Sequence, residues 1–205
     1  MALYELQQAR GYEIVSLLTT VTHGYERISM HGVREELLGR QAESLGLHLH
    51  KISIPQNPAN EEYEAIMKKV LTRYKKENVD SVAFGDVFLE DLRKYREENL
   101  AKIGMEGIFP IWKRDTRELV TTFIDLGFRA ITTCVDSNVL DSSFVGREID
   151  HEFICQLPSH VDPCGENGEH HSFVYGGPTF RREVGFILGE VVLRDGFYFC
   201  DLLPS

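Results

Sequence analysis

The stretch 61–86, EEYEAIMKKVLTRYKKENVDSVAFGD, decides the fold class. Its first part predicts a helix over Glu61–Lys76, because apolar residues recur there at helical spacing. The apolar run that follows predicts a buried strand over Val79–Phe84, which leads directly into Gly85–Asp86. A long helix feeding a buried strand is typical of a parallel α/β sheet, in which ligands bind beyond the carboxyl ends of the strands.

The same alternation of helix and strand extends in both directions along the chain. Further strands are predicted over Tyr12–Thr20, Leu47–Ile54, Gly107–Trp112 and Phe128–Val135. Further helices are predicted over Met1–Arg10, over Val33–Leu45, and from Asp115, whose Glu118 resembles a capping box, to Gly127. The run Tyr12–Thr20 is almost continuously apolar, so we expect that strand to be buried on both faces.

The character of the sequence changes after about Asp136. The segments Gly185–Leu193 and Phe197–Leu202, joined by the Arg194–Asp195–Gly196 turn, predict a hairpin. We therefore expect a Rossmann-like α/β part with a parallel sheet in residues 1–110 and a smaller, mixed α+β part in residues 111–205.

Composition excludes several classes of protein. The formal net charge of the 205 residues is −10, which argues against non-specific nucleic-acid binding because such binding needs a basic footprint. No apolar run reaches the length of a membrane span, and Met1–Gln8 lacks the features of a signal peptide. The four cysteines form no C-x-x-C pair. These features predict a cytoplasmic protein with reduced thiols and no membrane partner.

Two polar segments follow predicted strands. Asp86, after Gly85, has the chemistry to hold a metal ion or a hydroxyl group, or it simply caps the next helix. In the segment 27–32, RISMHG, the backbone around Met30 can read an adenine edge, and His31 can approach phosphates. The alternative for this segment is a surface loop in which Ser29 or His31 caps the helix.

The richest candidate site is the segment 162–171, DPCGENGEHH. Glu166 and Glu169 are suited to binding Mg²⁺ or orienting a nucleophile, and we favour such a role over a solvated turn. A zinc site built from Cys164 and nearby histidines is disfavoured, because the spacing fits no standard zinc pattern. We therefore assign no protein-ligated metal site.

Arg147 stands in the segment 145–150, VGREID, and has two readings of equal weight. Its guanidinium can pair with a substrate carboxylate or a phosphate. The other reading is a structural ion pair with Glu148 or Asp150.

Taken together, several segments resemble the PP-loop ATPase family that contains diphthine–ammonia ligase. They are, in order, RISMHGVREELLGRQAESLGL, VAFGDVFLEDLRKYRE, GIFPIWKRDTRELVTTFIDLGFRAI, LDSSFVGREID and HVDPCGENGEHHSFVYGGP. They cover nearly the whole chain. Gly85–Asp86 and Gly165–Glu169 are the most specific pieces, and the last segment resembles bacterial members of the family.

The resemblance implies an adenine nucleotide alpha hydrolase-like fold and an ATP-dependent ligase with Mg²⁺. ATP would adenylate a carboxylate with release of pyrophosphate, and ammonia would then attack to give an amide; the acceptor is a small molecule or a protein carboxylate. The implied roles are catalytic for Asp86, Glu166 and Glu169, cofactor-binding for Thr19, Met30, His31 and Gly85, and substrate-binding for Arg147, Gly165 and Gly168.

The sequence also departs from this family. Members begin with a strand and a loop of the form S-G-G-x-D-S, whereas Met1–Leu6 resembles the helix that follows that loop. We therefore expect the first, central strand to be missing, the parallel sheet to fall into two halves, and exposed apolar surface to favour a homodimer. The alternative to a ligase is a truncated, non-catalytic nucleotide- or ligand-binding protein.

Overall fold

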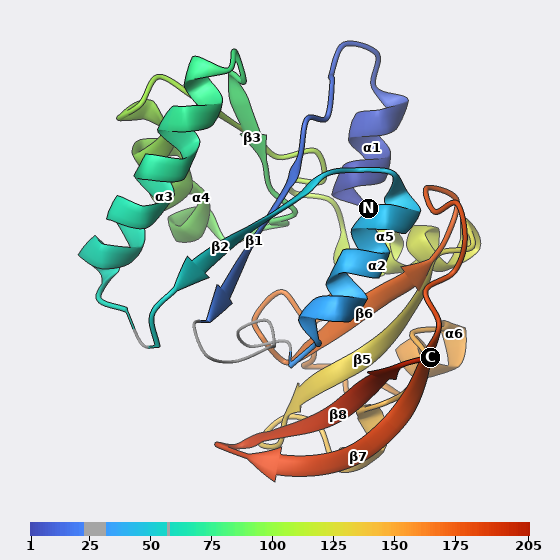
Figure 1. Ribbon diagram of the computed structural model, residues 1–205. Coiled ribbons are helices and arrows are strands. Elements are labelled where there is room, and N and C mark those ends of the chain that lie inside the picture. Colours follow the sequence, from blue (N-terminus) through green and yellow to red (C-terminus); the bar gives the residue numbers. More distant parts are fainter. Residues whose placement is uncertain (23–31, 57) are drawn as a thin grey trace.

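The protein is described by a computed structural model, which covers residues 1–22, 32–56 and 58–205. Figure 1 shows a mixed α/β architecture, with helices around short parallel strands and an antiparallel sheet at one end. The helices are α1 (Ala2–Gln8), α2 (Glu35–Leu45), α3 (Asn60–Lys76), α4 (Glu90–Ala101), α5 (Thr116–Asp125) and α6 (His151–Gln156). The strands are β1 (Leu17–Thr22), β2 (Leu49–Ile54), β3 (Ser81–Ala83), β4 (Glu106–Ile108), β5 (Arg129–Asp136), β6 (His170–Gly176), β7 (Phe186–Arg194) and β8 (Phe197–Pro204).

The parallel strands form two separate pairs. β1 pairs with β2, and β3 pairs with β4, each in parallel. No ladder joins β1 to β3 among the described residues. The expectation that the parallel part would fall into two halves is therefore confirmed.

The expected full burial of the parallel strands is wrong. β1 is half-buried apart from Val21, and Tyr12 and Val15, which precede it, are 51% and 48% exposed. β3 is likewise only partly buried. Each strand of these two-stranded sheets has a hydrogen-bonded neighbour on one side only, and the elements packed on the sheets leave part of their faces exposed.

The remaining strands form one antiparallel sheet in the order β6-β5-β8-β7. The predicted hairpin is confirmed, since β7 and β8 pair from Phe186↔Pro204 to Arg194↔Phe197. Asp195 and Gly196 form its turn with φ of 50° and 82°, the backbone region that a tight two-residue hairpin turn requires.

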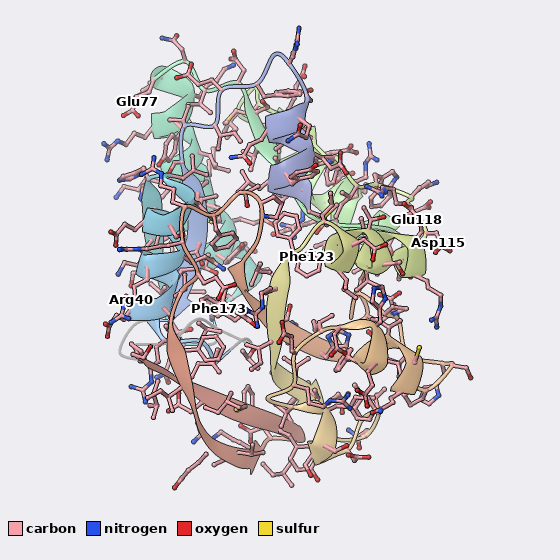
Figure 2. All side chains as sticks on the ribbon, turned by 90° about the vertical axis from the view of Figure 1, so that its right-hand side faces the viewer. Arg40, Glu77, Asp115, Glu118, Phe123 and Phe173 are labelled. Atoms are coloured by element: carbon pink, nitrogen blue, oxygen red, sulfur yellow. The ribbon has the colours of Figure 1, made fainter. Side chains whose placement is uncertain are left out.

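The largest hydrophobic core lies against this antiparallel sheet. It includes Leu37 of α2, Phe123 of α5, Phe153 of α6, Phe173 of β6 and Leu202 of β8. Figure 2 labels Phe123 and Phe173, which approach this core from a helix and from the sheet. The core therefore draws on both halves of the sequence.

Local signals fix the start of α5 and the end of α2 where the sequence predicted them, whereas α1 ends at Gln8, before the predicted Arg10. Asp115 caps α5 by accepting a hydrogen bond from the backbone N–H of Glu118 at 2.8 Å (Figure 2). Gly46 ends α2 with φ of 68°, the left-handed conformation that glycine adopts without strain. In the described part of the chain, no helix combines the length and hydrophobicity that crossing a membrane requires.

Candidate functional site

The loop after β3 carries the first part of the site. Asp86 accepts two hydrogen bonds from Arg96 of α4, at 2.7 and 3.2 Å. The same guanidinium lies over the ring of Phe84, 4.4 Å from its centroid. Asp86 therefore does not cap α4, whose N-cap residue is Leu89. A bidentate arginine holds this carboxylate in one orientation at the carboxyl end of the strand.

By its composition the run 93–98, RKYREE, is most simply interpreted as a solvated helix face, but Arg96 departs from that interpretation because it pairs with Asp86. Its side chain is 29% exposed and that of Asp86 is 12% exposed. A helical run rich in charged residues does not reveal which of them the tertiary structure turns inward. The only signal in the sequence was that Arg96 lies ten residues after a strand-end aspartate.

The second part of the site is the loop 162–169, which is closed by its own side chains. Glu169 accepts hydrogen bonds from the backbone N–H groups of Asp162 and Asn167, both at 3.0 Å. It also accepts from the Asn167 side chain at 2.9 Å. Burial by itself raises the pKa of Glu169, but the hydrogen bonds from these donors together have the larger effect, so the pKa is lowered. In this geometry Glu169 stabilises the loop, while its predicted catalytic role stays a prediction.

Gly165 is the tightest point of that loop. Its φ is +68°, and a Cβ at this position would lie 2.5 Å from the carbonyl oxygen of His170. Gly168 also has a positive φ, of +90°, but has open space where a side chain would be. The two glycines thus have turn-forming roles, and their predicted contacts with substrate stay predictions.

Glu166 joins the two loops. Its Oε1 accepts a hydrogen bond of 2.6 Å from the backbone N–H of Val87, next to Asp86. Its own N–H donates to Asp162 at 2.9 Å. Burial raises the pKa of Glu166, and the negative charges of Asp86 and Asp162 raise it further. The backbone N–H groups of Val87 and Phe88 lower it, but by less. Glu166 is therefore a carboxylate held beside other acids at a strand end, a setting typical of functional carboxylates.

The start of the chain lies against the junction of the loop after β3 with the loop 162–169, a contact that the sequence did not predict. Met1 and Cys164 both pack against a small buried cluster that includes Val87, and Cβ of Ala2 lies 4.0 Å from the Cβ position of Gly85. Burial lowers the pKa of the Met1 amino group, while Glu5 and Cys164 act in the opposite direction. Figure 1 shows the N-terminus in the middle of the molecule.

Cys164 is also part of the junction. Its Sγ lies 3.3 Å from the carbonyl oxygen of Thr116 and donates to it. Burial raises its pKa to about 12, so the thiol stays protonated at neutral pH and is a poor nucleophile. Among the described residues no cluster of three or more His, Cys, Asp or Glu side chains is placed to hold a metal ion.

His170 forms the inner wall of the loop. It is 4% exposed, and neither ring nitrogen has a hydrogen-bond partner within the described residues. Burial lowers its pKa, although Glu169 and Asp162 favour the charged form. Its ring packs against Phe153 at 5.7 Å between centroids. His170 is thus a neutral packing residue beneath the loop.

Arg147 lies over the ring of Phe153, which in turn packs against His170 of the loop's inner wall. Its guanidinium lies 5.6 Å from the centroid of Phe153 and donates to Gln156 at 2.7 Å. Neither expected ion pair forms, because Glu148 pairs with Arg129 at 2.9 Å and Asp150 caps Phe153 of α6 at 2.7 Å. The reading of Arg147 as a structural ion-pair residue is therefore wrong, and its substrate-binding role stays a prediction.

The structure thus brings together part of the predicted site. Gly85 and Asp86 meet Glu166 and its loop through the Val87 hydrogen bond. Thr19 lies in the middle of β1, half-buried and in register with Lys51, and its cofactor-binding role stays a prediction. Met30 and His31 lie outside the described residues.

The donor set of the junction fits a hydrated Mg²⁺ ion with a nucleotide. Asp86 and Glu166 offer carboxylate oxygens, the hard ligands that Mg²⁺ prefers. Mg²⁺ is commonly held by one or two carboxylates, with phosphates and water completing the shell, so a third protein ligand is not needed. Gly85 leaves its backbone open to a ligand, because the nearest atom to its Cβ position is 4.0 Å away.

Comparisons with known proteins identify the family of this chain. Residues 1–107 match the diphthamide synthase N-terminal domain, and residues 115–199 match the diphthamide synthase C-terminal domain. Among curated proteins, the chain is similar to the diphthine–ammonia ligases of Schizosaccharomyces pombe, Homo sapiens and Danio rerio. The respective identities are 25% over 147 residues, 26% over 133 residues and 26% over 171 residues.

These alignments cover 69%, 62% and 75% of this chain, and 24%, 49% and 66% of the respective relatives. The chain thus spans about a quarter to two thirds of the length of these relatives. The two domain models together extend over almost all of it, in the order that the fold requires. The chain belongs to the diphthamide synthase domain family.

Proposed function

We propose that the junction of the β3 loop and the loop 162–169 is the active site of an ATP-dependent, amide-forming ligase of the diphthine–ammonia ligase type. One observation supports this more than any other. The Glu166 carboxylate accepts the Val87 N–H at 2.6 Å and so stands beside Asp86 at a strand end. Two acids in that place suit Mg²⁺ and the phosphates of a nucleotide.

In this proposal ATP and Mg²⁺ are the cofactors. Bound Mg²⁺ offsets negative charge on the departing pyrophosphate when a carboxylate is adenylated. Asp86 and Glu166 would orient that ion, and Gly85 would let the phosphates approach the backbone. Arg96 fixes the orientation of Asp86 by two hydrogen bonds and is a positioning residue.

The substrates of the proposed reaction are a carboxylate and ammonia. The names of the relatives point to diphthine as the acceptor in those proteins. Here the acceptor class is a small-molecule or protein carboxylate, which the guanidinium of Arg147 is suited to bind. We further propose that residues 1–110 hold the nucleotide and residues 111–205 the acceptor, and that the reaction takes place in the cytoplasm.

A second function, non-catalytic binding of a nucleotide or another small ligand, has its own support. Asp86 is already paired with Arg96, and both carboxylate oxygens of Glu169 already accept loop hydrogen bonds. Carboxylates satisfied within the protein are suited to keeping a binding loop in shape. Under this reading a nucleotide is bound and remains intact.

Calorimetric titration with Mg²⁺ and ATP tests whether the junction binds a nucleotide. Glu166→Gln and Asp86→Asn should each weaken binding about tenfold or more, because each removes a negative oxygen from the proposed magnesium site. Glu77→Gln, at the exposed end of α3 (Figure 2), and Asp80→Asn, before β3, are the matched controls and should bind as the unmodified chain does. Binding that is equal in all five proteins would place the nucleotide elsewhere.

Pyrophosphate release separates the two functions. The chain is incubated with Mg²⁺, ATP, ammonium and a panel of carboxylates that includes diphthine. Release that depends on an acceptor and is lost in Glu166→Gln supports the ligase. Nucleotide binding without acceptor-dependent release of pyrophosphate supports the non-catalytic function instead.

A further inference from the structure

The outer strand of the antiparallel sheet exposes an unusual amount of apolar surface. β7 is the edge strand in the order β6-β5-β8-β7, and Figure 1 shows it as the outermost strand at the lower end of the molecule. Five of its aliphatic side chains are between 41% and 60% exposed: Ile187, Leu188, Val191, Val192 and Leu193. Aliphatic side chains with this exposure in one strand mark an interaction surface.

Both faces of this strand are apolar. Leu188 and Val191 stand opposite the buried residues Leu202 and Cys200, whereas Ile187 stands opposite Leu203, on the other face of the hairpin. β7 therefore extends beyond the part of the sheet that the core covers. Its sequence, FILGEVVLR, contains neither proline nor lysine, the residues that commonly protect a sheet edge from pairing. The strand shifts register between Leu188 and Val191, and its pairing with β8 is regular from Val191 to Arg194.

The charges on β7 identify its partner. The segment Glu190–Arg194 reads EVVLR, with an acid at one end, a base at the other and three aliphatic residues between them. If two copies of this segment pair antiparallel about Val192, Glu190 of each copy stands opposite Arg194 of the other. Val191 then faces Leu193, and Val192 faces its own copy at the twofold axis.

Other features agree with this register. Asp195 would lie opposite Gly189, so the pairing sets no like charges directly opposite each other. Neither Glu190 nor Arg194 forms an ion pair with another described residue, and both side chains are exposed. Opposite charges across a strand pair stabilise the pair, and isologous contacts of this kind close into a dimer.

We propose that β7 is a homodimerisation strand, which pairs antiparallel with β7 of a second copy about Val192 and joins two four-stranded sheets into one. The surface lies on the antiparallel sheet and not on the parallel strand pairs. The proposal is independent of the ligase function, because none of the residues proposed for the active site lies on β7.

Sedimentation equilibrium over a range of protein concentrations tests the proposal. We expect a dimer that dissociates on dilution. Glu190→Arg alone and Arg194→Glu alone should each give a monomer, because each sets like charges opposite each other. The double variant, in which the two charges are exchanged, should restore the dimer because the opposite pairs form again.

The control is Arg73→Glu, a charge reversal at an exposed position on α3, which should leave the dimer unchanged. Far-ultraviolet circular dichroism checks that every variant is folded; since the substituted side chains are exposed, we expect no change. A monomeric unmodified chain, a dimer that survives either single reversal, or a double variant that stays monomeric would each overturn the proposal.

Discussion

The parallel and antiparallel parts of this molecule differ in how they are buried. The antiparallel sheet rests on a core that reaches from Val33 to Leu202. The pair β3–β4 rests on a small cluster in which only Leu71, Leu100 and Met105 are fully buried. The proposed active site joins these parts, because Glu166 belongs to a loop anchored on the large core and Val87 follows β3. The comparison indicates that the proposed site forms only when the β3–β4 region, which has a small core, packs against the antiparallel sheet and its large core.

Phe153→Ala is expected to have the largest effect, because it removes the centre of the large core. Phe153 is fully buried and packs against Phe144 and His170. Loss of a buried phenylalanine typically costs about 3–5 kcal/mol. Urea unfolding measures the change in the free energy of unfolding. A loss below about 1 kcal/mol would show that this core is not the main support of the fold.

Leu100→Ala makes the same test in the β3–β4 region. Leu100 is 2% exposed, but the residues packed around its cluster are only partly buried and can move into the space that it leaves. We expect about 2 kcal/mol, the lower end of the range for such substitutions. Urea unfolding again gives the value. A loss equal to that of Phe153→Ala would remove the contrast between the two regions.

Gly165→Ala tests the loop that joins them. The added methyl group meets the carbonyl of His170 in a backbone conformation that alanine adopts with strain, and we expect a loss of about 1–3 kcal/mol. Gly168→Ala is the matched control, since its φ is also positive but its surroundings are open. Thermal unfolding should show the larger shift for Gly165→Ala. Equal shifts would mean that the contact with His170 has no energetic weight.

The pH dependence of stability gives the smallest and most local effect. Burial lowers the pKa of His170, whereas a histidine in the unfolded chain has a pKa of about 6.5. The unfolded state therefore takes up this proton first, and stability should fall as the pH drops below about 6.5. Thermal unfolding between pH 5 and 8, values chosen around the pKa of about 6.5, measures this slope.

The control for that slope is a pair of histidine variants. His170→Leu should flatten the dependence, whereas replacement of the exposed His151, which contacts Asp125, serves as the surface reference. If His170→Leu leaves the slope unchanged, the acid sensitivity arises from other groups, namely His171, whose pKa burial also lowers, or the carboxylates.

Much of the fold follows from short-range pattern. Asp115, Gly46, and the Asp195–Gly196 turn act on their own neighbours in sequence, so α5, α2 and the β7–β8 hairpin could be predicted. The burial of β1 could not be predicted in this way. An apolar strand is buried only if other elements cover it, and that cover depends on pairing far along the sequence.

The site divides in the same way. Gly85, Asp86 and Glu166 could be identified from their residue types and their place after a strand or in a loop. The residues that contact them could not be identified in this way. Arg96 stands in a charged run typical of a solvated helix face, and nothing in the sequence indicates that the Met1 amino group and Cys164 lie beside the site. Those contacts join residues far apart in the chain or select one face of a helix.

The sequence by itself determined the family, the order of the elements and the residue types available for chemistry, because these depend on local spacing and composition. Only the tertiary structure decided that Glu166 bonds to the Val87 N–H, that Arg96 holds Asp86, and that β7 is an exposed edge. The reason is that a hydrogen bond or a sheet edge belongs to two segments at once, and their approach depends on the packing of the whole chain.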